Sequence, residues 1–267
     1  MPDDQRFGIS REEIAVGLRH LGLGAGDVVL VHSAMSRLGW VEGGAEAVIG
    51  ALLDTVSPGG TVLFPTLTGT ERDGPEHPPV MDVRTSSCWT GRIPQIALAC
   101  PGAVRSLHPT HSVTAIGARA GEYTAGHERV TTPCGPGSPY VRLMERGGKI
   151  LLLGGVTQES NTSLHAMEEL ADVPYHLQPD ITIGFAIDAQ GGRHEVANRL
   201  HLWGWERDFR KVQPILERHD AARSLPIGAS SSTLIDAGAM RDTLMPLMRD
   251  APLFLLSDRA RIGFSAT

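Results

Sequence analysis

Cysteine is scarce in this sequence. Its 267 residues include only Cys88, Cys100 and Cys134, an odd number without a C-x-x-C pair. This pattern argues against a disulfide framework and against a zinc site built from cysteines. A chain of this length can bury a core without such cross-links, and low cysteine usage favours a reducing compartment. We therefore expect a cytoplasmic protein.

Long hydrophobic runs and an excess of positive charge are also missing. No apolar stretch approaches the roughly 20 residues that a membrane span needs. The first residues, MPDDQRFG, lack the basic start and apolar run of a secretory signal. The formal net charge of -6 argues against nucleic acid as a partner and suits a cationic ligand. We expect neither a membrane nor a nucleic-acid partner, and a homodimer remains open.

Apolar strands alternate with helices through the first two thirds of the chain. Ser10 and Glu13 form a capping-box pattern before an amphipathic helix that should end in the glycine-rich segment 22–27. Residues 70–92 are polar and aperiodic, which predicts a long loop of the kind that is usually functional or mobile. The other expected elements are buried strands at 28–32, 61–66 and 149–155 and helices at 44–55, from Ser138-Pro139 onward and at 161–173.

The last third of the chain has a different pattern. Residues 181–188 and the segment after QGG resemble a β-hairpin, and helices are expected around 207–219 and 236–249. GASSSTLID, between these helices, is predicted to be an edge strand. The whole pattern predicts an α/β fold with a mainly parallel central sheet flanked by helices, plus a small β-hairpin and helical portion at the C-terminal end. We expect residues 1–267 to form a single domain.

Three of the predicted strands end in polar or small residues. His32, Thr66 and Gly154 stand at these ends. In open α/β sheets, ligands bind beyond the carboxyl ends of the parallel strands. This edge of the sheet is therefore the expected functional site.

His165, Glu168 and Glu169 share one face of the predicted helix at 161–173, because they are three and four residues apart. An imidazole beside a carboxylate makes a suitable general base, since the carboxylate fixes the tautomer and stabilises the imidazolium. A surface ion pair has the same spacing. Spacing alone leaves both interpretations open.

The stretch RSLHPTHSV, residues 105–113, concentrates polar groups. His108 and His111 could bind a metal with a nearby glutamate, but the proline between them excludes the helical zinc motif. The arginine and serines of the stretch could instead hold a phosphate. An ordinary turn with a buried histidine bonded to the backbone is the third interpretation, and no local pattern separates the three.

Several stretches, taken together, carry a family resemblance. They are LVHSAMSRLGWVEGGAEAVIGALLDTVSPGGTVLFPT, RSLHPTHSVTAIGARA, GSPYVRLMERGGKILLLGG and NTSLHAMEELADVPY, with a weaker tail in ERDFRKVQPIL and GASSSTLIDAGAM. In this order the chain resembles the aminoglycoside 3-N-acetyltransferase family over nearly its whole length. The resemblance implies transfer of an acetyl group from acetyl-CoA to the 3-amino group of a 2-deoxystreptamine antibiotic, which confers resistance, and it implies no metal.

The resemblance also implies roles for single residues. The family's base maps onto His165 with Glu168 as its carboxylate partner, and the amine attacks the thioester directly. His32 is a second candidate for orienting the substrate or relaying the proton. The residues implied along the coenzyme are His32, Ser33, Ala34, Met35, Thr66, Arg105, His108, His111, Ser112 and Val113.

A polyamine substrate should meet carboxylates in its half of the cleft. Each chosen acid could instead be a solvated surface group, and this alternative is strongest for Glu169 and Asp172. Asp208 matches the family's acidic residue before a phenylalanine, here Phe209. The residues expected to bind this substrate are Asp82, Glu168, Glu169, Asp172 and Asp208.

Two positions depart from the family pattern. Ala34 stands where the family usually has serine, and Gln95 stands where many relatives carry an acid. These changes leave coenzyme affinity and substrate range open. The alternatives are an acetyltransferase of the same fold acting on a different amine metabolite, a protein that only sequesters a cationic ligand, and a zinc hydrolase.

Overall fold

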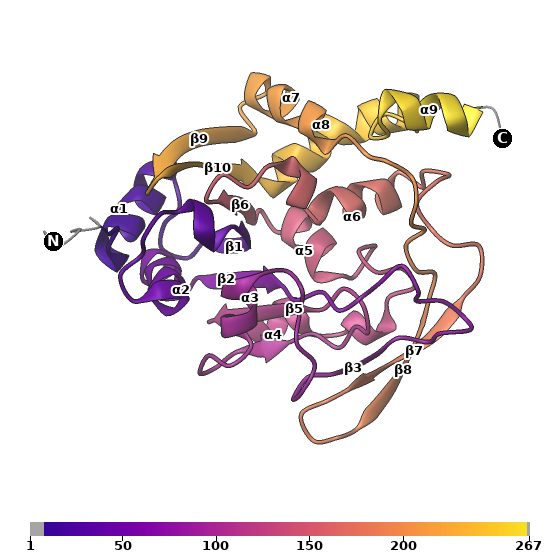
Figure 1. The fold of residues 1–267 in the computed structure, drawn as a ribbon, viewed down its shortest axis with the longest axis horizontal. Coiled ribbons are helices and arrows are strands. Elements are labelled where there is room, and N and C mark those ends of the chain that lie inside the picture. Colours follow the sequence, from indigo (N-terminus) through magenta and orange to yellow (C-terminus); the bar gives the residue numbers. More distant parts are fainter. Residues whose placement is uncertain (1–7, 266–267) are drawn as a thin grey trace, which may run out of the picture.

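The computed structural model describes residues 8–265 and contains a seven-stranded sheet with helices against both faces (Figure 1). Its strands follow the spatial order β4-β5-β2-β1-β6-β10-β9. In chain order they are β1 (Val28–Ser33), β2 (Thr61–Pro65), β4 (Val104–Arg105), β5 (Val113–Gly117), β6 (Lys149–Leu153), β9 (Ala222–Ile227) and β10 (Ser230–Asp236).

The centre of the sheet is parallel. β1 pairs in parallel with β2 on one side and with β6 on the other. The outer strands β5, β4, β10 and β9 join antiparallel, so the sheet as a whole is mixed. The predicted α/β fold with a parallel centre is confirmed.

One strand prediction is wrong in its position. β10, the GASSSTLID strand, lies inside the sheet between β6 and β9, and β9 forms the edge. The sequence of β9 contains Pro226, which cannot donate to a strand ladder and is tolerated at a sheet edge. Because of this proline, the sequence pattern did not indicate a strand at the position of β9.

Helices cover the two faces of the sheet because its strands alternate their side chains. Val29 and Val31 of β1 pack with one group of helices, whereas Val28 and Leu30 pack with the other. The first group is α1 (Arg11–Leu21), α2 (Gly44–Val56) and α3 (Arg92–Ala97). The second is α4 (Ala120–Thr124), α5 (Pro139–Glu145), α6 (Ser163–Leu170), α7 (Gln213–Arg218), α8 (Ala237–Asp250) and α9 (Asp258–Ser265).

The helix termini follow the sequence signals. Ser10 Oγ accepts a hydrogen bond from the Glu13 backbone N–H at 3.2 Å, and Glu13 Oε2 accepts one from the Ser10 N–H at 2.8 Å. At the start of α5, ahead of Pro139, the Ser138 hydroxyl accepts a hydrogen bond from the Val141 backbone N–H at 3.3 Å. Short 3₁₀ turns connect the other elements: η1 (Met35–Arg37), η2 (His127–Arg129), η3 (Gln158–Ser160) and η4 (Phe209–Val212).

A second, three-stranded sheet lies beside the main one (Figure 1). β7 (Thr182–Ile187) and β8 (Arg193–Asn198) form the predicted hairpin, and β3 (Val80–Asp82) pairs in parallel with β7. The segment at 70–92 is therefore not entirely loop. A strand of three residues is too short for a periodic pattern, and this explains why it was not predicted.

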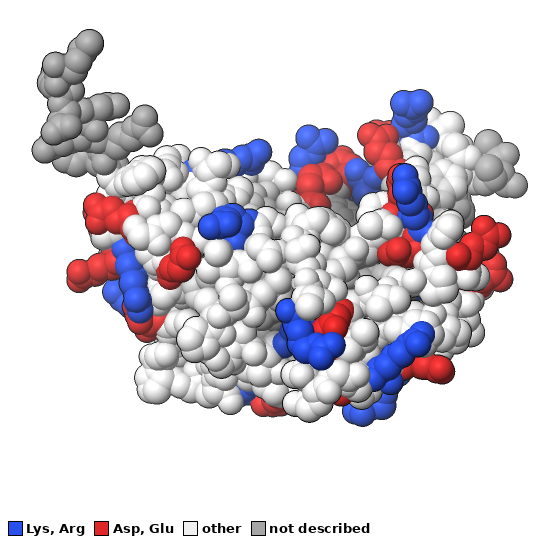
Figure 2. Space-filling model, turned by 60° about the horizontal axis from the view of Figure 1, so that its bottom comes forward, with Lys and Arg blue, Asp and Glu red and all other residues white. Residues whose placement is uncertain are grey.

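The surface carries charges of both signs. On the face shown in Figure 2, basic and acidic side chains are interspersed in small groups without a continuous basic area. None of the helices in the described part of the chain is long and apolar enough to span a membrane. The polar start of the sequence lies largely outside the described residues.

Candidate functional site

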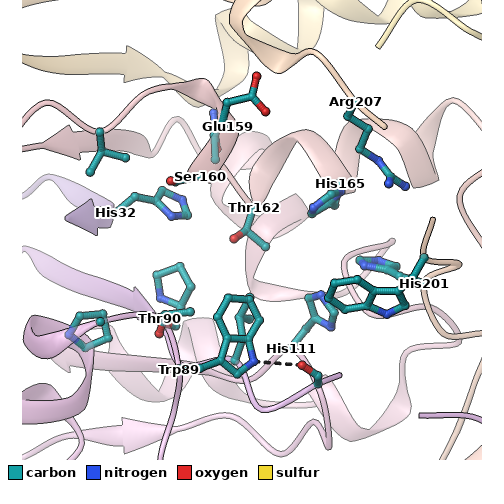
Figure 3. A pocket seen from close by; sticks show the side chains of 18 of the residues that line it. His32, Trp89, Thr90, His111, Glu159, Ser160, Thr162, His165, His201 and Arg207 are labelled. Atoms are coloured by element: carbon teal, nitrogen blue, oxygen red, sulfur yellow. Dashed lines mark hydrogen bonds between the residues drawn. The ribbon is translucent and has the colours of Figure 1, made fainter. Parts of the chain in front are cut away.

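A cavity of about 660 Å³ lies beyond the carboxyl ends of β1 and β2 (Figure 3). His32 and Ser33 at the end of β1 and Pro65 at the end of β2 line it. Its other walls are Val31, Leu67, Gly69, Trp89, Thr90, Gly91, Pro94, His111, Val156, Glu159, Ser160, Asn161, Thr162, His165, His201, Leu202, Trp203, Gly204, Trp205, Glu206 and Arg207. The cavity therefore lies at the sheet edge that the sequence indicated.

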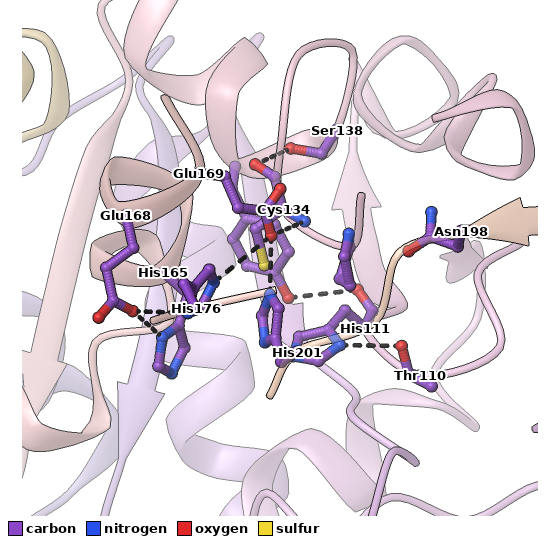
Figure 4. A network of polar contacts seen from close by, with 12 residues as sticks. Thr110, His111, Cys134, Ser138, His165, Glu168, Glu169, His176, Asn198 and His201 are labelled. Carbon is purple, nitrogen blue, oxygen red and sulfur yellow. Dashed lines mark hydrogen bonds and ion pairs between the residues drawn. The ribbon is translucent and has the colours of Figure 1, made fainter. Parts of the chain in front are cut away.

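His165 lines this cavity and is hydrogen-bonded to a carboxylate. Its Nδ1 lies 2.7 Å from Glu168 Oε2, one turn along α6 (Figure 4). The His165 side chain is 27% exposed while that of Glu168 is fully buried. Because a carboxylate accepts, His165 carries its proton on Nδ1 and leaves Nε2 free as a base.

Glu168 is ionised despite its burial. Burial alone would raise its pKa, but His176, His165 and Arg207 around the carboxylate outweigh this effect and lower the pKa to about 2. Arg207 Nε donates to Glu168 Oε1 at 2.9 Å and to Oε2 at 3.2 Å. The His165 partner is thus a fixed negative charge.

The adjacent Glu169 has the opposite character. Burial raises its pKa to about 8, so this carboxyl is mostly protonated at neutral pH. Its Oε1 accepts from the Cys134 backbone N–H at 2.8 Å and lies 2.7 Å from His201 Nε2. Glu169 therefore supports His201 behind the cavity wall.

Imidazoles pack closely around these carboxylates. Nitrogens of His165, His176 and His201 lie within 4.8 Å of one another, as do ligand atoms of His111, Cys134 and His201. Each group therefore offers three ligand atoms close enough together for one metal ion. The rings of His165 and His176 are stacked, with their centroids 5.3 Å apart and 15° between their planes.

The turn at 105–113 matches the third of its interpretations. His108 Nδ1 accepts from the backbone N–H groups of Thr110 at 3.2 Å and of His111 at 3.0 Å. Burial lowers the pKa of His108 well below its ordinary value, so the ring is neutral. Only His111 of the two histidines lines the cavity, and His108 belongs to neither group of potential metal ligands.

Arg105 does not line this cavity, but it lines a separate pocket of about 760 Å³. Its guanidinium donates to Ser112 Oγ and to the Thr66 carbonyl, both at 2.9 Å, and to the Ser86 carbonyl. Burial lowers its pKa to about 10, which leaves it charged at neutral pH. These bonds hold neighbouring segments of backbone together.

The other expected coenzyme residues divide in the same way. His32, Ser33 and His111 line the cavity. Ala34 follows β1 and Met35 begins η1, and neither is among the lining residues. The remaining residues are buried behind the wall and outside the cavity: Thr66, His108, Ser112 and Val113.

None of the five acids expected to bind a polyamine lines the cavity. Asp82 is hydrogen-bonded to Arg84, and Asp208 lies 3.5 Å from Arg210. Glu168 and Glu169 are buried and contact His165 and His201 respectively. Asp172 is exposed just after α6. The carboxylates that do line the cavity are Glu159 and Glu206.

Several lining residues had no assigned role in the sequence analysis. Trp89 and Thr90 come from the 70–92 segment, and Trp89 Nε1 donates to the Gly69 carbonyl at 2.9 Å (Figure 3). Gln95, one of the two departures, accepts from the Cys88 N–H and fastens this segment to α3. The stretch HLWGWER, residues 201–207, supplies most of one wall, and the aromatic and charged residues before Asp208 were the available signal.

The chain is similar to known proteins both in sequence and in fold. Aminoglycoside N(3)-acetyltransferase VII of Streptomyces paromomycinus is 42% identical over 181 residues, which cover 62% of this chain and 62% of that protein. The matched part thus spans less than two thirds of the length of this curated relative. The solved structure of AAC-IIIb in binary complex with CoASH is 31% identical, covers 91% of this chain and 97% of its own, and superposes with a TM-score of 0.77.

A second similar solved structure is a complex with an antibiotic. A variant of aminoglycoside acetyltransferase AAC(3)-IVa in complex with a gentamicin is 26% identical, covers 95% of this chain and 93% of its own, and has a TM-score of 0.80. The model of the family described as aminoglycoside 3-N-acetyltransferase matches residues 30–249. The chain therefore belongs to the aminoglycoside 3-N-acetyltransferase family.

Proposed function

We propose that this chain transfers the acetyl group of acetyl-CoA to the 3-amino group of 2-deoxystreptamine aminoglycosides, an activity that confers resistance. The observation that carries the proposal is the His165–Glu168 pair at 2.7 Å, with His165 on the wall of a cavity of about 660 Å³. Family membership supplies the reaction class. We further propose that residues 1–267 act as one domain, without a catalytic metal.

The proposed mechanism uses His165 as general base. Its Nε2 takes a proton from the amine as the amine nitrogen bonds to the acetyl carbonyl carbon. The carbon–sulfur bond breaks, the thiolate of coenzyme A leaves, and the proton held by His165 passes to that thiolate or to water. Glu168 remains ionised throughout and stabilises the imidazolium.

His32 fits the role of an orienting residue. Burial lowers its pKa to about 3, so the ring is neutral, and its Nε2 is buried without a hydrogen-bond partner among the described residues. A neutral imidazole on the cavity wall can donate one hydrogen bond to the acetyl carbonyl oxygen. The lining residues Ser33 and His111 remain the proposed coenzyme contacts, and we assign Thr66, Arg105, His108, Ser112 and Val113 to supporting that wall.

The composition of the cavity wall favours a second candidate, an acetyltransferase acting on a different amine with fewer charges. Glu159 and Glu206 are the lining carboxylates, and Arg207 adds a positive charge beside His165. A polycation gains from several carboxylates, whereas a monoamine needs one. If the substrate is a polycation, Glu159→Gln and Glu206→Gln should each raise its KM more than that of a monoamine.

The test is acetylation of a panel of 2-deoxystreptamine aminoglycosides and simple amines, followed by NMR mapping of each product. Acetylation at the 3-amino position of an aminoglycoside is the expected result. Acetylation of a simple amine alone would support the second candidate. Binding of acetyl-CoA without product from any amine would contradict both.

A further inference from the structure

Arg207 uses each guanidinium nitrogen in a different contact. Nε donates to both oxygens of Glu168, at 2.9 and 3.2 Å. Nη1 donates to the Trp205 carbonyl at 3.0 Å, and Nη2 lies 3.0 Å from His176 Nδ1. The side chain is 15% exposed, so these contacts fix it between the cavity wall and the buried carboxylate.

His176 lies against both Arg207 and Glu168, because its Nδ1 is 3.0 Å from Arg207 Nη2 and 3.1 Å from Glu168 Oε2. Burial lowers the pKa of His176 to about 3, in agreement with a neutral ring. Arg207 is therefore the permanent positive charge in direct contact with Glu168.

This geometry determines the charge that His165 experiences. Glu168 contacts His165 at Oε2 and Arg207 mainly at Oε1, so one carboxylate is shared by the base and the arginine. A carboxylate that is already paired with a guanidinium stabilises a proton on a neighbouring group less than an unpaired carboxylate does. The buried side chain of Glu168 makes this compensation strong, because water screens it little.

We propose that Arg207 is a positioning residue for the base: it locks Glu168 toward His165 and offsets its charge, so that the His165–Glu168 pair is free of an additional proton near neutral pH. This inference rests on the proposed function for its kinetic test. Without Arg207 the pair would retain one proton to higher pH, whether on the imidazole or on the carboxyl. In either form the base is unavailable.

Other titratable and charged groups surround the pair and are unchanged by a substitution at position 207. Around Glu168 they come from the segments before and after α6 as well as from α6 itself. They are His32, His111, Cys134, Glu169, Tyr175, His176 and His201. Their presence in every variant makes the comparison specific to Arg207.

The kinetic test compares the pH profile of kcat/KM for the wild-type protein, Arg207→Met and Arg207→Lys. In Arg207→Met the acid limb should move upward by about one pH unit or more, and activity should return toward the wild-type value at high pH. Arg207→Lys retains the charge and should keep the limb close to that of the wild type. Arg207→Gln replaces the methionine variant if the latter does not fold.

Arg199→Met is the matched control. Arg199 lies on the same connecting segment, and its Nε donates only to the Gln178 carbonyl in an exposed setting. Its pH profile should coincide with that of the wild type. A merely structural role of Arg207 would lower kcat/KM equally at every pH, and a limb that does not move would overturn the proposal.

A second readout needs no turnover. The ¹⁵N imidazole resonances of His165, assigned by their loss in His165→Asn, can be titrated in the wild type and in Arg207→Met. The titration midpoint should rise in the variant by about the same amount as the acid limb. A raised midpoint in a protein that acetylates no amine would support the role of Arg207 and contradict the proposed function, whereas an unmoved midpoint in an active protein would do the reverse.

Discussion

At the scale of single residues, two neighbouring glutamates have opposite ionisation states. Glu168 has a pKa near 2 because a guanidinium and imidazoles outweigh its burial, and Glu169 has a pKa near 8 because burial dominates. The i,i+3 spacing was sufficient to predict the contact between His165 and Glu168. It could not show which carboxylate is charged, since this depends on Arg207 and on other groups distant in sequence.

Glu169 gives a prediction about stability. Its pKa rises from 4.5 in the unfolded chain to about 8 in the folded protein, so between these values the folded state holds one more proton. This contribution is fully present below pH 4.5 and is lost as the pH rises through 8, with a slope of at most about 1.4 kcal/mol per pH unit. Glu169→Gln should remove this slope in urea unfolding measured from pH 5 to 8.

Glu71→Gln serves as the control for this experiment, because Glu71 is an exposed acid in the loop before β3. Its unfolding free energy should follow the pH dependence of the wild type. An unchanged slope in Glu169→Gln would show that Glu169 is ionised in the folded protein.

At the scale of elements, the strand ends were the reliable sequence signal. The buried runs ending at His32 and at Gly154 were recognisable because their apolar residues stop abruptly at a polar or glycine position. β3, β4, β5 and β9 were not predicted. β3 and β4 are very short, and β9 contains Pro226. Short and edge strands depend on pairing with neighbours more than on their own periodicity.

Gly154 has a defined structural requirement at the end of β6. Its φ is 77°, and an added Cβ would lie 2.7 Å from the Ala34 carbonyl oxygen. Gly154→Ala should therefore lower the unfolding free energy by about 1–2 kcal/mol from the backbone conformation alone, plus the cost of displacing the turn after β1. Urea unfolding measures the loss.

The matched control is Gly121→Ala within α4, where no atom lies within 4 Å of the added Cβ. Alanine should be neutral or stabilising there by about 0.5–1 kcal/mol, because glycine is unfavourable inside a helix. Equal stability changes in the two variants would contradict the assigned role of Gly154.

At the scale of the whole molecule, net charge proved a poor guide to the cavity. The chain carries a formal charge of -6, yet the acids chosen from the sequence lie in ion pairs, in the buried network or on the exposed surface. The net charge of the whole chain does not determine which carboxylates line one cavity. The overall fold was more predictable, because successive apolar residues of a strand point to opposite faces of the sheet and so make both faces apolar.

The proposed function depends above all on His165 acting as the base at the carboxyl edge of this sheet. Free-thiol release from acetyl-CoA with an accepted amine should be measured for the wild type, His165→Asn and the exposed control His219→Asn. We expect kcat to fall by about 10²–10⁴-fold in His165→Asn with the fold intact, while His219→Asn behaves as the wild type. A folded His165→Asn variant with the turnover of the wild type would show that the base lies elsewhere.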